Sequence, residues 1–424
     1  MKILDINYEK YKLKNGFEVI LHQNKKLPLA AVNIWYKVGS SFEKRGKTGL
    51  AHLFEHMMFQ GSENAEKEMH FRLIQEAGGT LNGSTTFDRT NYYEKVPSNF
   101  LELALWLEAD RMGFLLPSLT LEKLDNQKGV VSNERLERYE NQPYGLAWEK
   151  IIGSLFPEDH PYSWPTIGYL DDIKSYTMDD VSNFFKNYYS PSNASLVVAG
   201  DFDIDHCKNL IEKYFSEIKS NGEVKNSFTY PASLKGNIET AYEDNVQLER
   251  VYICWHTDKA YSNDDAALDT ISDILSGSKN SRLHKKLVHE KEIAQDVHAM
   301  QISGKLGGIF MIAATAKPGK NINELKKEIF DELETLQNEG ASDRELIKSK
   351  NGIKSSFIYS LQQIDNLADH LNSYNYFLDE PNSFLKDLNR YERIDNDSIK
   401  SAAQKYLSKP NVQLTVVPSA KGLK

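Results

Sequence analysis

The chain carries one stretch of sequence twice, and this internal repeat limits the fold to architectures built from two similar halves. The stretch 188–198 aligns without a gap with the stretch 406–416, at an offset of 218 residues (406 − 188). The identical positions are Tyr188/Tyr406, Ser190/Ser408, Asn193/Asn411, Leu196/Leu414 and Val198/Val416. A second echo pairs residues 31–35 with 250–254, at an offset of 219 (250 − 31). Two matches at nearly the same offset predict a duplicated domain.

Each half alternates short strand patterns with longer helical patterns, which predicts the α+β class. In the first half the expected strands are residues 17–22, 31–38, 79–86, 90–96 and 194–199. The short turn between the third and fourth of them implies antiparallel pairing. We expect two homologous domains, each an antiparallel-rich mixed sheet covered by helices on one face. Their boundaries are 1–218 for the first domain, 219–236 for a polar linker and 237–424 for the second domain.

Composition excludes several classes of protein. A net charge of −9, from 51 basic and 60 acidic residues, argues against a nucleic-acid binder, which needs a basic face. No apolar run approaches the ~20 residues of a membrane span. Two cysteines, Cys207 and Cys254, are too few for a disulfide-stapled secreted module. The N-terminus lacks the apolar core of a signal peptide, so we expect a cytoplasmic protein. The mature form of an exported, periplasmic precursor would read the same way.

The strongest chemical signal lies on the predicted helix 49–59, which contains His52-Leu-Phe-Glu55-His56. His52 and His56 are four residues apart and therefore project from one face, with Glu55 beside them. The rest of the helix is apolar, which predicts that it is buried. Buried ionisable groups need compensation, and two imidazoles at this spacing suit zinc. The spacing HxxEH is the inverse of the zinc-protease pattern HExxH. The competing interpretation is a pair of hydrogen-bonded core histidines with a capping glutamate.

A catalytic zinc usually has three protein ligands, and Glu134 is the candidate for the third. It follows Val130 and Val131 by four and three positions on a predicted helix, so it should share their apolar, inward face. Glu137 and Glu140 are nearby alternatives, which we interpret as solvated helix charges.

The motif followed 78 residues later (134 − 56) by Glu134 resembles the inverted-motif zinc peptidases, the family of pitrilysin, insulin-degrading enzyme and mitochondrial processing peptidase. Residues 49–61, 78–93 and 130–144 also resemble its signatures. The chain looks closest to zinc-carrying bacterial subunits of about its own size, 48.4 kDa. The resemblance implies a zinc-dependent endopeptidase in which domain 1–218 is the catalytic domain.

By that resemblance, His52, His56 and Glu134 bind one Zn²⁺ per chain, and Glu55 is the general base. The family also binds substrate as an added strand along a free sheet edge, here at Asn82 and Gly83. Members usually have alanine where this chain has Gly83, a departure that leaves the backbone role intact.

The second half lacks this chemistry. The matching helix, residues 265–275, has no histidine or glutamate, so domain 237–424 should bind no metal. Self-sufficient relatives supply an arginine and a tyrosine from this half, but Val288 and Gln295 occupy those positions. We therefore expect a heterodimer with a homologous subunit that lacks HxxEH and supplies Arg and Tyr. Two clamshell halves would enclose a chamber for short or unfolded peptides. The alternatives are an inactive structural or assembly subunit, and a self-sufficient homodimeric peptidase.

Overall fold

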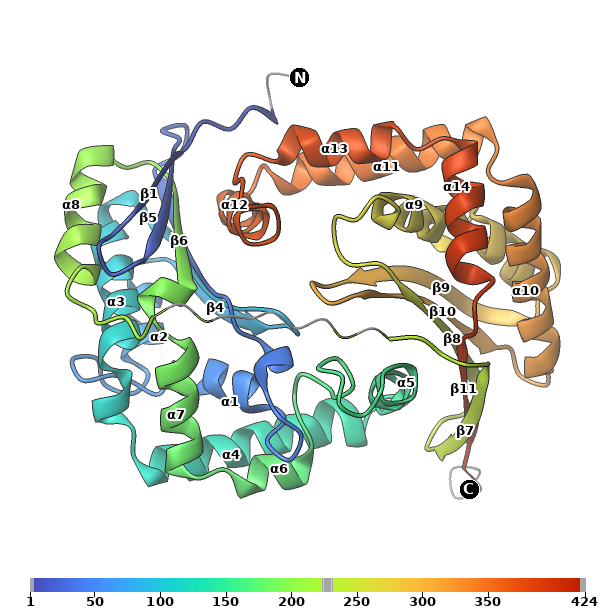
Figure 1. The fold of residues 1–424 in the computed structure, drawn as a ribbon, viewed down its shortest axis with the longest axis horizontal. Helices are drawn as coiled ribbons and strands as arrows, with labels where there is room; N and C mark the ends of the chain where they lie inside the picture. The colour runs from blue at the N-terminus through green and yellow to red at the C-terminus, as the bar shows by residue number, and fades with distance from the viewer. Residues whose placement is uncertain (1–3, 223, 225–229, 231, 420–424) are drawn as a thin grey trace. The chain divides into compact units, whose positions relative to one another are not determined.

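Two separate mixed sheets organise the chain in the computed structural model, which describes residues 4–222, 224, 230 and 232–419 (Figure 1). The described residues group into two compact units. Unit 1 draws on residues 1–135, 164–227 and 357–385, and unit 2 on residues 136–163, 228–356 and 386–424. Each unit therefore includes one segment from the other half of the chain. The domain limits 1–218, 219–236 and 237–424 describe the repeat in the sequence and remain a proposal.

The sheet of unit 1 has six strands in the order β1-β2-β6-β3-β5-β4. The strands are β1 (Glu9–Lys12), β2 (Glu18–Gln23), β3 (Leu29–Tyr36), β4 (Thr80–Thr85), β5 (Thr90–Pro97) and β6 (Ala194–Gly200). All neighbours are antiparallel except β2 and β6. The helices are α1 (Leu50–Met57), α2 (Met69–Glu76), α3 (Leu101–Ser118), α4 (Leu121–Arg135), α6 (Leu170–Ser175), α7 (Met178–Tyr188), α8 (Ile204–Phe215) and α12 (Ile364–Leu378).

The sheet of unit 2 repeats this topology in the order β7-β11-β8-β10-β9. The strands are β7 (Ile238–Asp244), β8 (Arg250–Thr257), β9 (Ala294–Ser303), β10 (Gly308–Ala316) and β11 (Val412–Pro418), with only β7 and β11 parallel. The helices are α5 (Ala147–Leu155), α9 (Asp265–Ser276), α10 (Ile322–Glu339) and α14 (Asn396–Ala402), with most of α11 (Asp343–Ser360) and α13 (Phe384–Glu392). Replacing β2, β6, β3, β5 and β4 by β7, β11, β8, β10 and β9 converts the first order into the second, except that the edge strand β1 has no counterpart among the described residues. The predicted pair of homologous α+β domains is confirmed.

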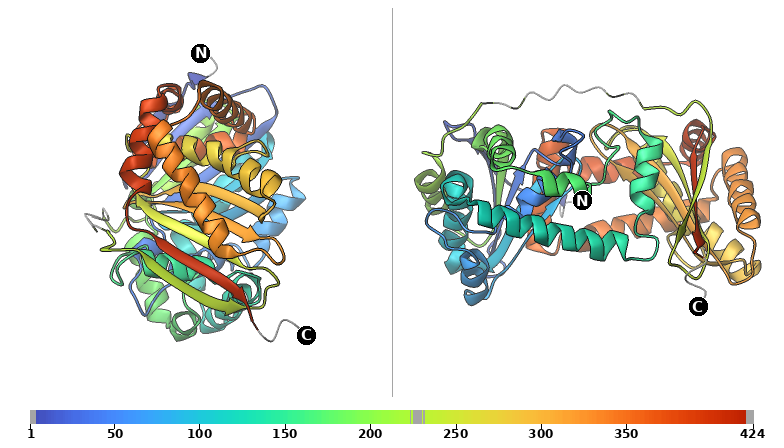
Figure 2. Two further views of the ribbon diagram at one scale, coloured as in Figure 1. Left: turned by 90° about the vertical axis from the view of Figure 1, so that its right-hand side faces the viewer. Right: turned by 90° about the horizontal axis from the view of Figure 1, so that it is seen from below.

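Both faces of each sheet carry helices, and Figure 2 shows helices packed against the two sheets. In unit 1, α3 packs on β3 and β5 while α12 packs on β3 and β6. In unit 2, Val251, Ile253 and Trp255 of β8 face the core that the sheet forms with α9, α10 and α14. Helix α5 packs on the opposite face of this sheet, where Phe156 contacts the ring of His256. One helix from the other half of the chain therefore covers the second face of each sheet, which adds to the predicted covering of one face.

Local sequence explains where several elements begin. Thr177 and Asp180 form a capping box at the start of α7, and Asp395 with Ser398 forms one at the start of α14. β6 is buried along its whole length, as expected for a strand with neighbours on both sides. Among the described residues, every helix is too short or too polar to span a bilayer.

Candidate metal centre

Helix α1 is held at its N-terminus by a glycine and a buried carboxylate. Gly49 has φ +88°, and a Cβ there would lie 2.4 Å from Ile167 O, so only glycine fits. The Glu43 carboxylate accepts hydrogen bonds from the N–H groups of Gly49 (2.8 Å) and Ala51 (2.7 Å). A carboxylate at this end satisfies free N–H groups and complements the helix dipole. These contacts fix the start of the helix one turn before the HxxEH side chains.

The three ionisable side chains of α1 are only half-buried. The core-facing residues Leu53, Phe54 and Met57 have no exposed surface, but His52 and His56 keep 14% and 25% of their side-chain surface. We expected His52, Glu55 and His56 to be buried in the core, and they are only partly buried. The apolar residues of α1 pack to one side of the helix and leave the other side more open. A partly open site is what a hydrolytic centre needs, since substrate and water must reach it.

Glu134 of α4 lies against both histidines. Its Oε2 is 3.2 Å from His56 Nε2 and 3.8 Å from His52 Nε2, and the two rings are 4.8 Å apart between centroids. One ligand atom from each of the three residues falls within 4.8 Å of the others. Ligands about 2.0–2.1 Å from a tetrahedral zinc are about 3.3 Å from one another, so this donor set fits Zn²⁺.

The face of α4 that carries Glu134 differs from the prediction. Val131 is fully buried, but Val130 is 41% exposed. Glu134 therefore stands one turn from an exposed valine, at the border between the packed and open sides of α4, because the helix packs along a narrower stripe than its apolar residues suggested. Glu137 and Glu140 are exposed and do not join the ligand group.

Glu55 points toward the edge strand β4. Thr85 Oγ1 donates a hydrogen bond of 2.6 Å to Glu55 Oε2. Burial raises the pKa of Glu55, against the opposing effects of the Thr85 hydrogen bond and of His56. A Cβ at Gly83 would lie 3.1 Å from Glu55 Cγ and 3.2 Å from Tyr92 Cδ1. Glycine at position 83 therefore leaves more space for the Glu55 side chain than an alanine would.

Strand β4 is the last in its sheet and has one edge without a strand neighbour in the described part of the chain. Thr86 N–H donates to Arg89 O (2.9 Å) and closes the hairpin with β5. By the alternation of antiparallel pairs, Gly83 and Thr85 then direct their N–H and C=O groups toward the free edge. Gly83 N–H is within 2.9 Å of Asn82 Oδ1, so the Asn82 side chain covers the donor at this edge.

A second group of potential ligands, His70, Glu94 and Glu108, lies in the core of unit 1. The Arg111 guanidinium lies between the two carboxyl groups of this cluster. It donates to both Glu108 oxygens (Nε to Oε2 at 2.9 Å) and to Glu94 Oε1 (3.3 Å). It also lies 4.2 Å above the Tyr92 ring. Burial raises the pKa of Glu108 well above its usual range. We interpret this cluster as a buried ionic network, since the guanidinium already occupies the space between the carboxylates.

Helix α9 takes the place of α1 in unit 2 and carries aspartates but no histidine or glutamate. Arg390 pairs with Asp265 (2.8 Å), and Tyr391 OH donates to Asp269 Oδ2 (2.7 Å). Burial and the neighbouring Asp265 raise the pKa of Asp269 from 3.8 to about 7. In the described part of unit 2, no three His, Cys, Asp or Glu side chains lie close enough together to share a metal ion.

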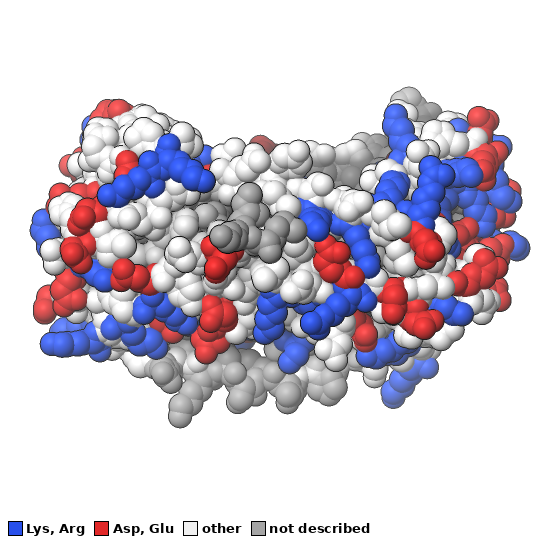
Figure 3. All heavy atoms as spheres, turned by 90° about the horizontal axis from the view of Figure 1, so that it is seen from above, with Lys and Arg blue, Asp and Glu red and all other residues white. Residues whose placement is uncertain are grey.

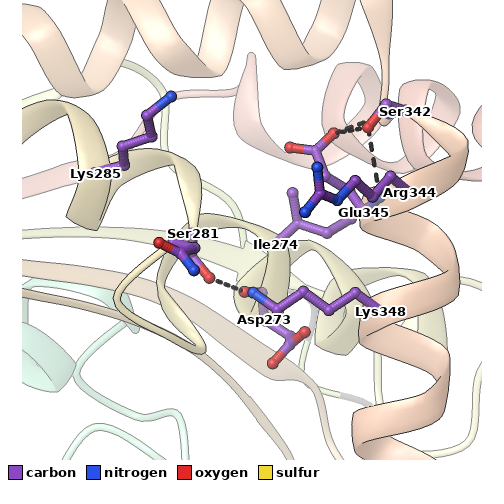
Figure 4. Close-up of a pocket in the computed structure, with 9 residues that line it drawn as sticks. Asp273, Ile274, Ser281, Lys285, Ser342, Arg344, Glu345 and Lys348 are labelled. Carbon is purple, nitrogen blue, oxygen red and sulfur yellow. Dashed lines mark hydrogen bonds between the residues drawn. The ribbon is translucent and has the colours of Figure 1, made fainter.

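Unit 2 contains a cavity of about 490 Å³, lined mainly by polar and charged side chains that include Asp273, Lys285, Glu345 and Lys348 (Figure 4). Two of its charged groups have local partners: Arg282 Nε donates to Glu345 Oε1 (2.6 Å), and Lys285 pairs with Glu290 (3.3 Å). On the face drawn in Figure 3, Lys and Arg side chains lie among Asp and Glu side chains.

Comparison with known proteins gives consistent matches. Residues 18–157 match the family described as Insulinase (Peptidase family M16), and residues 175–353 match the Peptidase M16 inactive domain. The chain is 32% identical over 367 residues to the zinc protease PqqE of Helicobacter pylori, which covers 85% of this chain and 82% of that protein. It is 24% identical over 421 residues to a probable mitochondrial-processing peptidase subunit beta of Arabidopsis thaliana, covering 96% and 77% of the two chains.

Two solved structures share the fold over nearly the whole chain. The crystal structure of a protease from Helicobacter pylori superposes with a TM-score of 0.92 at 28% identity, covering 97% of this chain and 100% of that one. A peptidase M16 inactive domain from Pseudomonas fluorescens superposes with a TM-score of 0.88 at 18% identity, covering 98% and 99%.

Proposed function

We propose, because the chain belongs to the insulinase family of peptidases (peptidase family M16), that it is the zinc-carrying subunit of an endopeptidase acting on short or unfolded peptides. The observation that carries this proposal is the convergence of His52, His56 and Glu134 within 4.8 Å, next to Glu55. Two imidazoles and one carboxylate form the ligand set of many hydrolytic zinc centres.

The residues divide the work of peptide hydrolysis. Zinc held by His52, His56 and Glu134 would supply a Lewis acid that polarises the peptide carbonyl and acidifies a water. Glu55 would accept the proton of the attacking water and return it to the leaving amine nitrogen. The Thr85 hydroxyl, 2.6 Å from Glu55 Oε2, would hold that carboxylate in place during the transfer.

Strand β4 would receive the peptide as an added strand of the sheet. The main-chain groups of Gly83 and Thr85 face the free edge and would pair with the peptide backbone, which gives affinity with little side-chain selection. Asn82 would release the Gly83 N–H that it now covers and offer its own amide to the peptide.

A partner subunit would complete the site. Val288 packs against the core of unit 2 and carries no hydrogen-bond donor, and Gln295 is exposed on β9 but has no phenol. We therefore propose a homologous subunit that lacks HxxEH and supplies the arginine and tyrosine that would stabilise the oxyanion. The competing proposals are the inactive structural subunit and the self-sufficient homodimer.

The test is peptide cleavage by the purified, zinc-loaded chain, alone and with the homologous subunit that copurifies from the native source. The heterodimer proposal expects a large gain in activity on mixing, and a fall in activity of at least about 10²-fold in Glu55→Gln with zinc retained. Activity of the chain alone at the mixed rate would favour the homodimer. No cleavage in any combination, despite bound zinc, would favour the structural subunit.

The double variant Val288→Arg, Gln295→Tyr gives a second test of the missing pair. It should raise the activity of the chain alone, because it restores the two side chains by which self-sufficient relatives hold substrate. The single variants serve as matched controls, since either side chain without the other should raise the cleavage activity only slightly.

A further inference from the structure

A row of polar side chains on α12 packs against the sheet of unit 1, on the face opposite α3. Asp369 is the centre of this row. Its Oδ1 accepts hydrogen bonds from Trp35 Nε1 (2.8 Å), Asn91 Nδ2 (2.9 Å) and Asn33 Nδ2 (3.3 Å). Trp35, Asn91 and Asn33 are all buried, so one carboxylate oxygen satisfies three donors on β3 and β5 that water does not reach. Such a contact is specific, because a displaced helix would leave these donors unpaired.

The network continues from Asn91 to the edge strand through Arg89. The Arg89 guanidinium lies 5.0 Å above the Trp35 ring. One of its terminal nitrogens donates to Ser84 O (2.9 Å), Ser84 Oγ (2.6 Å) and Asn91 Oδ1 (3.2 Å). Ser84 Oγ in turn donates to Asn91 Oδ1 (2.7 Å). Ser84 belongs to β4, so the chain of contacts that starts on α12 ends on the backbone of the edge strand.

The next residue of β4 is held from the opposite face. Successive side chains of a strand alternate between faces, and Thr85 therefore points away from Arg89 and donates to Glu55. The edge strand is thus fixed at residues 84 and 85 from both sides. On one side is the Asp369–Asn91–Arg89 network, and on the other is Glu55. Arg89 also lies in the field of the Asp369, Glu55 and Asp88 carboxylates.

We infer that Asp369 is a positioning residue for peptide binding, which acts through Asn91 and Arg89 to hold the edge strand β4 where a peptide would pair with it. The inference rests on the proposed function, in which β4 receives the substrate. It assigns to a helix from the second half of the chain a role in the centre built by the first half. Asp369 does not touch the ligands or Glu55, so its loss should affect peptide binding more than the chemical step.

The experiment compares Asp369→Ala, Asp369→Asn and Asp365→Ala in the zinc-loaded full chain, with its partner subunit if one is required. Asp365 lies one turn earlier on α12 and pairs with Lys95 (3.1 Å), away from the hairpin end, which makes it the matched control. In Asp369→Ala we expect KM to rise about tenfold with kcat within about twofold, because Asn91 and the two donors on β3 lose their common acceptor and the hold on β4 weakens. Asp369→Asn retains an acceptor oxygen and should recover most of this loss. Asp365→Ala should match the wild-type chain.

Amide hydrogen exchange separates the inference from the proposed function, because it needs no substrate. Asp369→Ala should speed exchange in the hairpin 80–97 and leave α1 unchanged, whereas Asp365→Ala should leave the hairpin tip protected. Equal exchange in Asp369→Ala and wild type, or a fall in kcat with unchanged KM, would overturn the positioning role. If wild-type protein cleaves no peptide, the proposed function fails, and the exchange result still decides whether Asp369 holds β4.

Discussion

Asp269 should make the stability of this chain depend on pH, and the size of the effect follows from its surroundings. On α9, burial and the nearby Asp265 raise the pKa of Asp269 from 3.8 to about 7. A difference of three units at 1.36 kcal/mol per unit disfavours the ionised form in the folded state by about 4 kcal/mol. A carboxyl with a raised folded-state pKa stabilises the fold below the unfolded-state pKa, and this contribution is lost as the pH rises. The window therefore runs from about pH 4 to about pH 7.

The variant Asp269→Asn removes the charge and keeps an oxygen that can accept the Tyr391 hydroxyl, 2.7 Å away in the wild type. We expect equal stability of the two proteins at pH 4 and a more stable variant at pH 8, by up to about 4 kcal/mol. The assay measures the free energy of unfolding in urea at several pH values. Hydrogen exchange of the β10 amides reports the stability of the same unit. Asp273→Asn, one turn along α9, is the charge-matched control. Parallel pH profiles for wild type and Asp269→Asn would refute the argument.

Three further predictions concern the centre and its support. Glu55→Gln should lower kcat at least about 10²-fold while zinc content, measured by mass spectrometry, stays at one per chain; wild-type turnover would exclude Glu55 as the base. Gly83→Val should lower kcat severalfold, because a Cβ there would press on Glu55 Cγ at 3.1 Å; unchanged kcat and KM would show that the side chain gives way freely. Arg111→Met should cost about 3–5 kcal/mol in urea unfolding, since it leaves two buried carboxylates without their cation; a loss under about 1 kcal/mol would contradict a buried ionic network.

The ligands on α1 could be predicted because their geometry is local. His52 and His56 are neighbours on any helix, whatever the tertiary structure, and the duplicated strand order follows from the repeat in the sequence. Helix periodicity made Glu134, 78 residues later (134 − 56), a candidate third ligand, but the family resemblance was needed to place it beside the histidines, because periodicity alone does not say which helices meet. The exposure of Val130 illustrates this limit, since an apolar residue on a helix is not necessarily an inward one.

The groups that support the centre were not predicted, because they depend on contacts between distant parts of the chain. The hydrogen bond between Asn91 and Asp369 joins residues 278 apart in sequence. Glu43 caps α1 from a preceding loop, and Gly49 at the N-cap position has no side chain from which this contact could be predicted. Arg111 is one of four charged residues on the mostly apolar α3, and only the packing reveals that it is buried between the carboxyl groups of Glu94 and Glu108.

Location of the metal by anomalous X-ray diffraction at the zinc edge, on crystals of the zinc-loaded chain, tests the central assignment most directly. We predict a single strong peak per chain, within about 2.0–2.2 Å of His52 Nε2, His56 Nε2 and a carboxylate oxygen of Glu134. A zinc peak elsewhere, or a fully loaded chain in which Glu134 stays out of contact with the ion, would contradict it.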